Sequence, residues 1–233
     1  LCTATPSQND FIELGTASEC LGVMTQSDML GYFFRETENR RHTVFTDEKY
    51  HVKWEFKPHS ERPFWRWVAS WSRALQKPSD LGFDDGKFLL PPLNYHNHVI
   101  DIPYIPEGEL FSRPAISLRE QREERKRTIP ERCEKVAALV NHDKPAIVWC
   151  HYNAEGDYLE KLIPGSVQIA GRHTIEEKET RLEDFALGRT RVMISKPKIA
   201  CWGLNLQHCG DMTFFPTFSY EGFYQGVRRC WRF

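Results

Sequence analysis

The chain has 233 residues, of which 40% are hydrophobic and 27% are charged, and its formal net charge is -1. This composition can bury a hydrophobic core and excludes a disordered tail, and the near-neutral charge means that any nucleic-acid contact must come from a local patch. No apolar run reaches the roughly 18 residues that a membrane span needs, so no membrane partner is predicted.

The seven cysteines are odd in number, and no two of them have C-x-x-C spacing. A disulfide framework or a zinc ribbon is therefore not expected, and no metal site is predicted. Reduced and mostly buried thiols fit a cytoplasmic protein better. The chain has no initiator Met and starts directly in LCTATP, so we expect both of its ends to be cuts through a longer protein.

Residues 1–115 give a less regular pattern, which predicts a mostly helical segment. Apolar positions after Ser60 repeat at helical spacing, so we predict a helix capped by Ser60 whose apolar face extends to Leu75. Its tryptophans could stack on bases, but the spacing of Trp67 and Trp71 favours a packed core face. The other predicted elements are a strand ending in LCTAT, a helix over 9–21, a hairpin of 41–45 with 50–56, a turn-rich stretch over 77–86 and an extended connector over 96–106.

Residues 118–140 predict one charged and then amphipathic helix, and strands alternate with helices after it. Alternation with short connections predicts parallel β-α units, and strands that are apolar throughout predict a sheet covered by helices on both faces. Ligands of such doubly wound sheets sit beyond the carboxyl ends of the strands. The predicted strands are 145–150, 166–171, 191–195 and 211–216, and the predicted helices are 154–163, one capped by Thr174 with Glu177 and one capped by Ser219.

Three segments carry the candidate chemistry: TATP at 3–6, ISKPKIACWGLNLQHC at 194–209 and FYQGVRRCWRF at 223–233. They resemble motifs III, V and VI of superfamily 2 helicases, especially Swi/Snf-like and phage DEAD-like members. The resemblance implies an α/β fold with a RecA-like doubly wound parallel sheet, preceded by an irregular, mostly helical segment. It also implies two domains: 1–115 as the end of a first motor lobe with an insertion or connector, and 116–233 as a second RecA-like lobe truncated at motif VI.

The physics of these spacings agrees with the resemblance. Arginines three positions apart on a helix share one face, and their guanidinium groups can each donate two hydrogen bonds to phosphate oxygens. Two solvent-exposed helix arginines without a function would show the same spacing. We expect Arg232 to face a solvated cleft. A glycine lets backbone amides approach a phosphate, whereas the plain alternative is an ordinary Gly-Asn turn.

The resemblance assigns each motif a role. It implies catalytic roles for Arg232, Arg229 and Gln225, cofactor binding by Gly203, Asn205, Arg229 and Arg232, and nucleic-acid binding by Thr3, Thr5, Ser195, Lys196, Gly203, Leu204 and Asn205.

No G-x-x-x-x-G-K-[ST] phosphate loop and no DEAD- or DEAH-like tetrad occurs in these 233 residues. In the resembling family both elements precede TATP, so we expect this chain alone not to hydrolyse ATP. The implied function is the C-terminal part of an ATP-dependent DNA helicase or translocase. It implies ATP and Mg²⁺ in the parent protein, a missing N-terminal motor lobe, and DNA as partner with RNA not excluded, in the cytoplasm of a bacterial or phage-infected cell.

Two other functions remain open. The first is a non-enzymatic helicase-like module for docking nucleic acid or protein. The second is a thiol enzyme at Cys150, although a phosphatase-like loop would want Arg at the position of Gly156, and a buried thiol is favoured. His96 and His98 would share a strand face but have no evident third ligand, so a structural role is expected for both.

Overall fold

The computed structural model describes residues 2–7, 10–37, 53–102, 114–201 and 203–233. The chain divides into two compact units, Leu1–Gly86 and Lys87–Phe233, which are described separately. Among the described residues, every helix is too short or too polar to cross a lipid bilayer.

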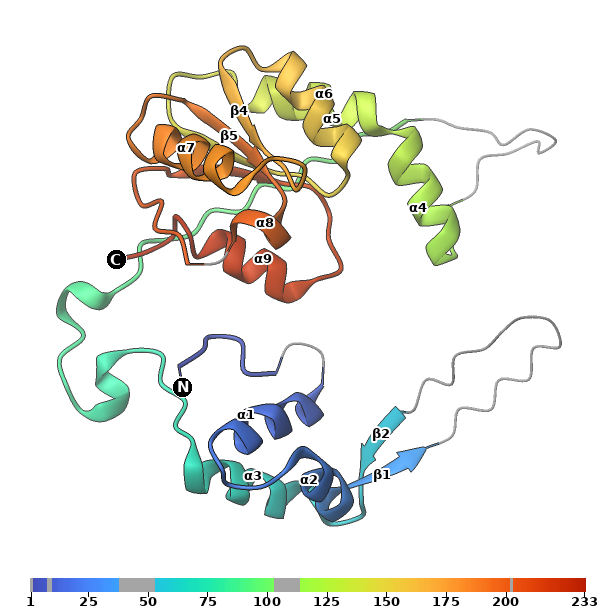
Figure 1. Ribbon diagram of the computed structural model, residues 1–233, viewed down its shortest axis with the longest axis vertical. Coiled ribbons are helices and arrows are strands. Elements are labelled where there is room, and N and C mark those ends of the chain that lie inside the picture. Colours follow the sequence, from blue (N-terminus) through green and yellow to red (C-terminus); the bar gives the residue numbers. More distant parts are fainter. Residues whose placement is uncertain (1, 8–9, 38–52, 103–113, 202) are drawn as a thin grey trace, which may run out of the picture. The chain divides into compact units, whose positions relative to one another are not determined.

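The second unit is built on a four-stranded parallel sheet with the strand order β4-β5-β3-β6. Figure 1 labels two of its strands, β4 and β5. Each strand lies close to one of the short apolar runs of the sequence, because a strand covered on both faces needs apolar side chains in both directions. Its strands are β3 (Ala146–Trp149), β4 (Ser166–Ile169), β5 (Val192–Ser195) and β6 (Asp211–Phe214).

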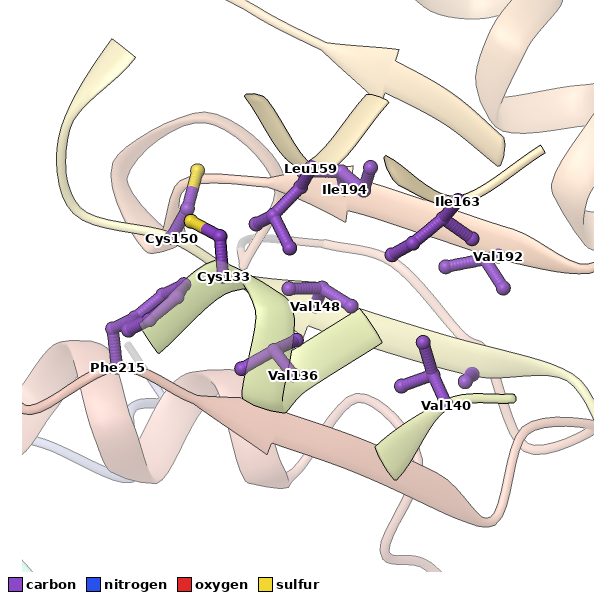
Figure 2. Close-up of a cluster of buried hydrophobic side chains, with 11 residues drawn as sticks. Cys133, Val136, Val140, Val148, Cys150, Leu159, Ile163, Val192, Ile194 and Phe215 are labelled. Atoms are coloured by element: carbon purple, nitrogen blue, oxygen red, sulfur yellow. The ribbon is translucent and has the colours of Figure 1, made fainter. Parts of the chain in front are cut away.

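Helices cover both faces of this sheet, as the alternation of side chains along β3 shows. Ala146 and Val148 pack with α5 (Ile129–Leu139) and α6 (Asn153–Leu162), and Figure 2 shows the side chains of this cluster pointing toward one another. Other helices and loops cover the opposite face, which β3 reaches through Ile147 and Trp149: α7 (Ile175–Ala186), α8 (Pro197–Ala200) and the chain around Leu206 and Cys209. The predicted doubly wound parallel sheet is confirmed.

Local signals place the helices of this unit. The Thr174 hydroxyl accepts the amide of Glu177 at 3.2 Å, and the Glu177 carboxylate accepts the amide of Thr174 at 2.8 Å, which is a capping box. Likewise, the Ser219 hydroxyl accepts the amide of Gly222 at 3.0 Å at the start of α9 (Tyr220–Val227). Both predicted caps are confirmed.

The single helix predicted over 118–140 is wrong, because the structure has two helices there. They are α4 (Leu118–Arg127) and α5, with Thr128 between them. Pro130 has no amide hydrogen and crowds the preceding turn, so it can begin a helix but cannot continue one. The Thr128 hydroxyl donates to the Glu124 carbonyl at 2.8 Å and satisfies part of the interrupted turn.

The first unit packs helices against a two-stranded antiparallel sheet around a core of Leu14, Met29, Phe33, Phe34 and Phe64. Trp67 and Val68 cover this core partly, as the predicted packed face requires. Its elements are the 3-10 helices η1 (Phe11–Glu13) and η2 (Pro78–Leu81), the helices α1 (Leu14–Cys20), α2 (Gln26–Phe33) and α3 (Glu61–Trp71), and the strands β1 (Phe34–Thr37) and β2 (Lys53–Phe56).

Three sequence predictions for this unit need correction. The strand that pairs with β2 is β1, whereas the predicted partner 41–45 lies outside the described residues. Helix α3 ends at Trp71, because Ser72 is extended and its hydroxyl donates to the Val68 carbonyl at 2.7 Å, so Leu75 is not on the helix and is 52% exposed. Ser60 occupies the capping position of α3 but makes no side-chain capping bond.

A fourth correction concerns the start of the chain. Residues 2–7 form no strand, so the strand predicted to end in LCTAT is not found there. Thr5 instead donates its amide to the Thr3 hydroxyl at 3.1 Å, a local turn that side chains of this type favour over a strand ladder.

The division between the two compact units lies near Gly86, and the predicted assignment of 1–115 and 116–233 to two motor lobes stays a prediction. Residues 89–102 have no regular secondary structure and belong to the second unit. The Trp231 indole donates to the Pro91 carbonyl at 2.8 Å, and Phe88, in the short helix η3 (Gly86–Phe88), lies 5.2 Å from Phe233 between ring centroids.

Gly226 lets α9 lie close to the sheet, and this close approach gives a test of the packing. A Cβ atom at this position would stand 2.9 Å from the Phe214 ring and 3.4 Å from the Trp149 ring. We expect Gly226→Ala to lower the free energy of unfolding by about 1–3 kcal/mol, because extra volume in a packed core forces neighbours apart. Urea unfolding, with hydrogen exchange of the β3 amides as a local readout, measures this loss.

The matched control is Gly210→Ala, since a Cβ atom there meets nothing within 4 Å. We expect that variant to change the unfolding free energy by less than about 0.5 kcal/mol. Equal stability of the two variants would show that α9 does not pack on Phe214 and Trp149 in solution.

Candidate functional site

Two of the predicted motifs meet at one main-chain oxygen. The Leu204 carbonyl accepts a hydrogen bond from Arg229 Nη1 at 3.0 Å and another from Arg232 Nη2 at 3.1 Å. In the other direction, the Leu206 amide donates to the Arg229 carbonyl at 3.0 Å. The loop that follows α8 and the chain that follows α9 are therefore joined into one structure, which we call the Leu204 junction.

Arg229 is the buried member of this junction, with 9% of its surface exposed. Its Nε atom donates to the Gln225 carbonyl at 2.9 Å and its Nη2 atom to Gln225 Oε1 at 3.0 Å, so Gln225 fixes the plane of the guanidinium group. Burial, followed by the charge of Arg232, lowers the pKa of Arg229, although a guanidinium group stays protonated in proteins. The junction thus holds a buried positive charge on neutral oxygens.

The expectation that Arg229 and Arg232 share one face of a helix is wrong, because α9 ends at Val227. Arg229 lies in the turn that follows, where its amide donates to the Gly226 carbonyl at 3.2 Å, and Arg232 lies just beyond that turn. Arg232 does not point free into a solvated cleft in this structure, since it is half-buried and its Nε atom also donates to the Arg228 carbonyl at 3.1 Å. The turn, and not a helix face, brings the two guanidinium groups together.

The loop residues after β5 differ in what they present to solvent. Ser195 is 1% exposed and its hydroxyl donates to the Ile169 carbonyl at 2.9 Å, so it ties β5 to β4. Gly203 is exposed with φ at +71°, a conformation that favours glycine, and Asn205 is exposed beside it. Lys196 is half-buried at the start of α8. Gly203 and Asn205 are therefore accessible to solvent, as are Gln207 and His208 further along the loop.

Thr3 and Thr5 belong to the first unit, Leu1–Gly86. Thr3 is exposed and Thr5 is half-buried. His96 and His98 are exposed as well, and among the described residues no group of three or more His, Cys, Asp or Glu side chains could hold a metal ion. The structure thus assembles the second and third motifs with each other, and leaves TATP in a separate unit.

A buried ion pair at the carboxyl end of β3 escaped the sequence analysis. Glu155 is 1% exposed, and its carboxylate lies 2.7 Å from Arg132 Nη1. The same carboxylate accepts the amides of His151 at 2.7 Å and Tyr152 at 2.9 Å, which fixes the loop between β3 and α6. The only sequence signal for this site is a glutamate in the first turn of a predicted helix, which indicates a capping role. The ion pair itself has no local signal, because its arginine lies 23 residues away in the sequence.

Positive side chains lie at the same edge of the sheet as His151. Trp149 at the end of β3 pairs with Ser195 at the end of β5, so His151 and Lys196 follow neighbouring strand ends, and the exposed Lys198 lies two residues further along. Burial is the main cause that lowers the pKa of His151, and the negative charge of Glu155 opposes it. The charges of Arg125, Lys196 and Lys198 lower that pKa as well.

Cys150 does not have the environment of a catalytic thiol. Its side chain is 3% exposed, and burial, followed by the charge of Glu155, raises its pKa to about 12. The nucleophilic species is the thiolate, which such a pKa suppresses near neutral pH. The structure therefore argues against the thiol-enzyme alternative.

Two solved structures show a weak, partial similarity to this chain. One is the C-terminal part of the Fun30 ATPase domain, with a TM-score of 0.39 and 15% sequence identity over 45% of this chain and 36% of that chain. The other is the Hef helicase domain of Pyrococcus furiosus, with a TM-score of 0.35 and 15% identity over 49% of this chain and 27% of that chain. The chain therefore spans about a third of each of them, and neither activity is transferred to it.

No protein-family model matches the chain, and no curated protein matches it significantly.

The thiol chemistry of Cys150 can be tested directly. We expect iodoacetamide at about pH 8 to alkylate Cys150 at least about 100-fold more slowly than the exposed Cys20, because Cys150 is buried and holds almost no thiolate. Mass spectrometry of the labelled peptides over time measures both rates in one sample. Comparable rates at the two positions would reopen the thiol-enzyme alternative.

Proposed function

We propose that this chain is the C-terminal part of an ATP-driven nucleic-acid translocase of the superfamily 2 helicase type, with the end of the first motor lobe followed by the second motor lobe. The observation that carries the proposal is the Leu204 junction, where two arginines hold the carbonyl oxygen of a loop whose neighbours Gly203 and Asn205 are exposed. A translocase must couple phosphate chemistry to its grip on nucleic acid. A loop and an arginine turn that are hydrogen-bonded to each other in both directions support such coupling.

In this proposal, the two arginines and the loop have separate roles. Arg232 would exchange its bond with the Leu204 carbonyl for a phosphate oxygen of ATP and stabilise the charge that develops during hydrolysis. Arg229, buried and held by Gln225, would keep the turn in place as a positioning residue. Gly203 and Asn205, with Lys196 nearby, would contact the nucleic-acid backbone without reading bases. Ser195 would act through the sheet, since its hydroxyl is buried.

The phosphate loop and the Mg²⁺ ligands of this reaction would belong to a first motor lobe outside these 233 residues, since the chain contains neither motif. Thr3 and Thr5 would then couple the nucleotide site to the nucleic-acid site. The nucleic-acid partner of the whole protein would be DNA, with RNA as the alternative. Lys196 at the start of α8 and the exposed Lys198 within it support a polyanionic partner.

One observation favours a second function, a docking module without ATP hydrolysis. Both arginines of the junction are already engaged by main-chain oxygens, so a purely structural role would account for them without any nucleotide. The two functions differ in what Arg232 does during ATP turnover.

That difference can be measured in a protein that joins this chain to the motor lobe with the phosphate loop. We expect Arg232→Ala to lower the steady-state ATPase rate by about 10³–10⁵-fold while nucleotide affinity changes little, because an arginine finger acts mainly in the transition state. Arg232→Lys should fail as well, since a point charge cannot reproduce the planar fork.

Arg228→Ala is the matched control. The guanidinium carbon of Arg228 lies 5.3 Å from the centroid of the Trp231 ring, whereas the bonds to the Leu204 carbonyl come from Arg229 and Arg232. We expect it to retain most of the ATPase rate. Near-normal turnover in Arg232→Ala would reject the finger role of Arg232. Absence of ATP turnover in the wild-type joined protein would reject the motor function and favour the docking module.

A further inference from the structure

An aromatic surface outside the three motifs follows β6 in the second unit. Phe218 and Tyr220 are 67% and 69% exposed, and they line a hollow of about 330 Å³ together with Phe215 and Phe223. Two large exposed aromatic rings, one in the loop before α9 and one in the first turn of that helix, cost solvation, so they indicate a binding surface more often than a structural need. The ATP and nucleic-acid roles assigned above use none of these side chains.

An arginine side chain lies against the face of the Phe218 ring. The guanidinium carbon of Arg125, in α4, lies 4.3 Å from the ring centroid, a cation–π distance. Arg132 lies in the same way 4.9 Å from the ring centroid of Phe215. Because most of the Phe218 surface stays exposed, Arg125 orients the ring without burying it.

The buried ion pair at the end of β3 holds this arrangement in position. Arg132 is fixed by Glu155 and also donates to the main-chain carbonyl of Arg125. The backbone of α4 beside Phe218 is therefore tied to the sheet through a side chain that is itself paired and mostly buried. The ring is presented on a rigid support, which is what stacking on a flat partner requires.

The charges near this surface favour a polyanion. Arg125 lies over the Phe218 ring, Lys196 follows β5 where that strand pairs with the end of β3, and Lys198 two residues further along is exposed. The acidic neighbours are largely occupied, since Glu124 is paired with Arg127 at 2.7 Å and Glu155 with Arg132. Glu221 is half-buried in the first turn of α9. An aromatic face beside several cations has the two features that single-stranded nucleic acid needs, one for bases and one for phosphates.

We propose that Phe218, supported by Arg125, is a stacking platform for an unpaired base of single-stranded nucleic acid. The inference rests on the proposed function and deepens it, because it adds a contact to the base to a lobe that otherwise grips the backbone. Any base can stack on a phenyl ring, so the contact adds affinity for single strands without sequence preference. Bases of an intact duplex are already stacked and cannot reach the platform, so single strands are bound more tightly than duplex.

The test uses this chain and two fluorescent single strands of about 12 nucleotides, one of oligo(dT) and one with the same phosphates but abasic sugars. Anisotropy titrations at low salt give the affinity for each strand. We expect Phe218→Ala to weaken binding of oligo(dT) by about 5–100-fold and to leave binding of the abasic strand within about twofold of wild type. Phe218→Tyr should bind oligo(dT) about as tightly as wild type, because it keeps an aromatic ring at this position.

Two further variants separate stacking from general effects. Lys198→Ala should weaken both strands by similar factors, since it removes a phosphate contact, and both affinities should fall as salt rises. Phe83→Ala removes an aromatic ring with 69% exposure from the first unit and should leave both affinities unchanged. Circular dichroism of each variant confirms that folding is intact.

The outcomes distinguish this inference from the proposed function. If wild type binds neither strand at low salt, the nucleic-acid function itself fails, and the platform fails with it. If wild type binds both strands and Phe218→Ala behaves like wild type, the platform is overturned while a backbone-gripping lobe remains, and the surface becomes a candidate for protein docking. An equal loss for both strands in Phe218→Ala would also overturn the platform, because stacking acts on bases alone.

Discussion

The carbonyl oxygen of Leu204 accepts hydrogen bonds from two arginines that lie 25 and 28 residues further along the chain. A single main-chain acceptor with two lone pairs can hold both guanidinium groups, and charged donors make such bonds stronger than neutral ones. The loop after α8 therefore cannot move independently of the turn after α9. A ligand that drew Arg232 away from Leu204 would also change what holds Gly203 and Asn205, and the proposed coupling of phosphate chemistry to nucleic-acid grip would rest on that link.

The sheet supplies the rigidity that this coupling requires. Trp149 is fully buried in β3, and Gly226 allows α9 to lie against it and against Phe214, so the turn after α9 starts from a fixed position. The ion pair of Glu155 with Arg132 fixes the loop between β3 and α6 in a similar way. Buried charges are costly unless they are paired and hydrogen-bonded, and this pair is both. Precise loops on a parallel sheet thus depend on polar contacts that the apolar core alone does not provide.

The sequence predicted the sheet well, because strands covered on both faces must be apolar and their helices carry visible caps such as Thr174. It did not predict contacts between residues far apart in the sequence or contacts made by backbone atoms. The sequence pattern predicts one helix across Pro130, because the apolar spacing continues past the proline that separates α4 from α5. The bond to Leu204 has no residue signature, since every residue offers a carbonyl. The pairing of Glu155 was hidden for a similar reason, because its partner lies in another helix.

Hydrogen exchange at the Leu206 amide tests the Leu204 junction most directly, because this amide donates to the Arg229 carbonyl. Arg229→Met keeps the length of the side chain and removes all three of its donated bonds, while Arg228→Met changes a neighbour outside the junction. We expect Arg229→Met to accelerate exchange at Leu206 by at least about tenfold, which corresponds to about 1.4 kcal/mol of local stability, and Arg228→Met to leave it nearly unchanged. Unchanged protection of Leu206 in Arg229→Met would contradict the account, because the loop would then hold its place without the arginine.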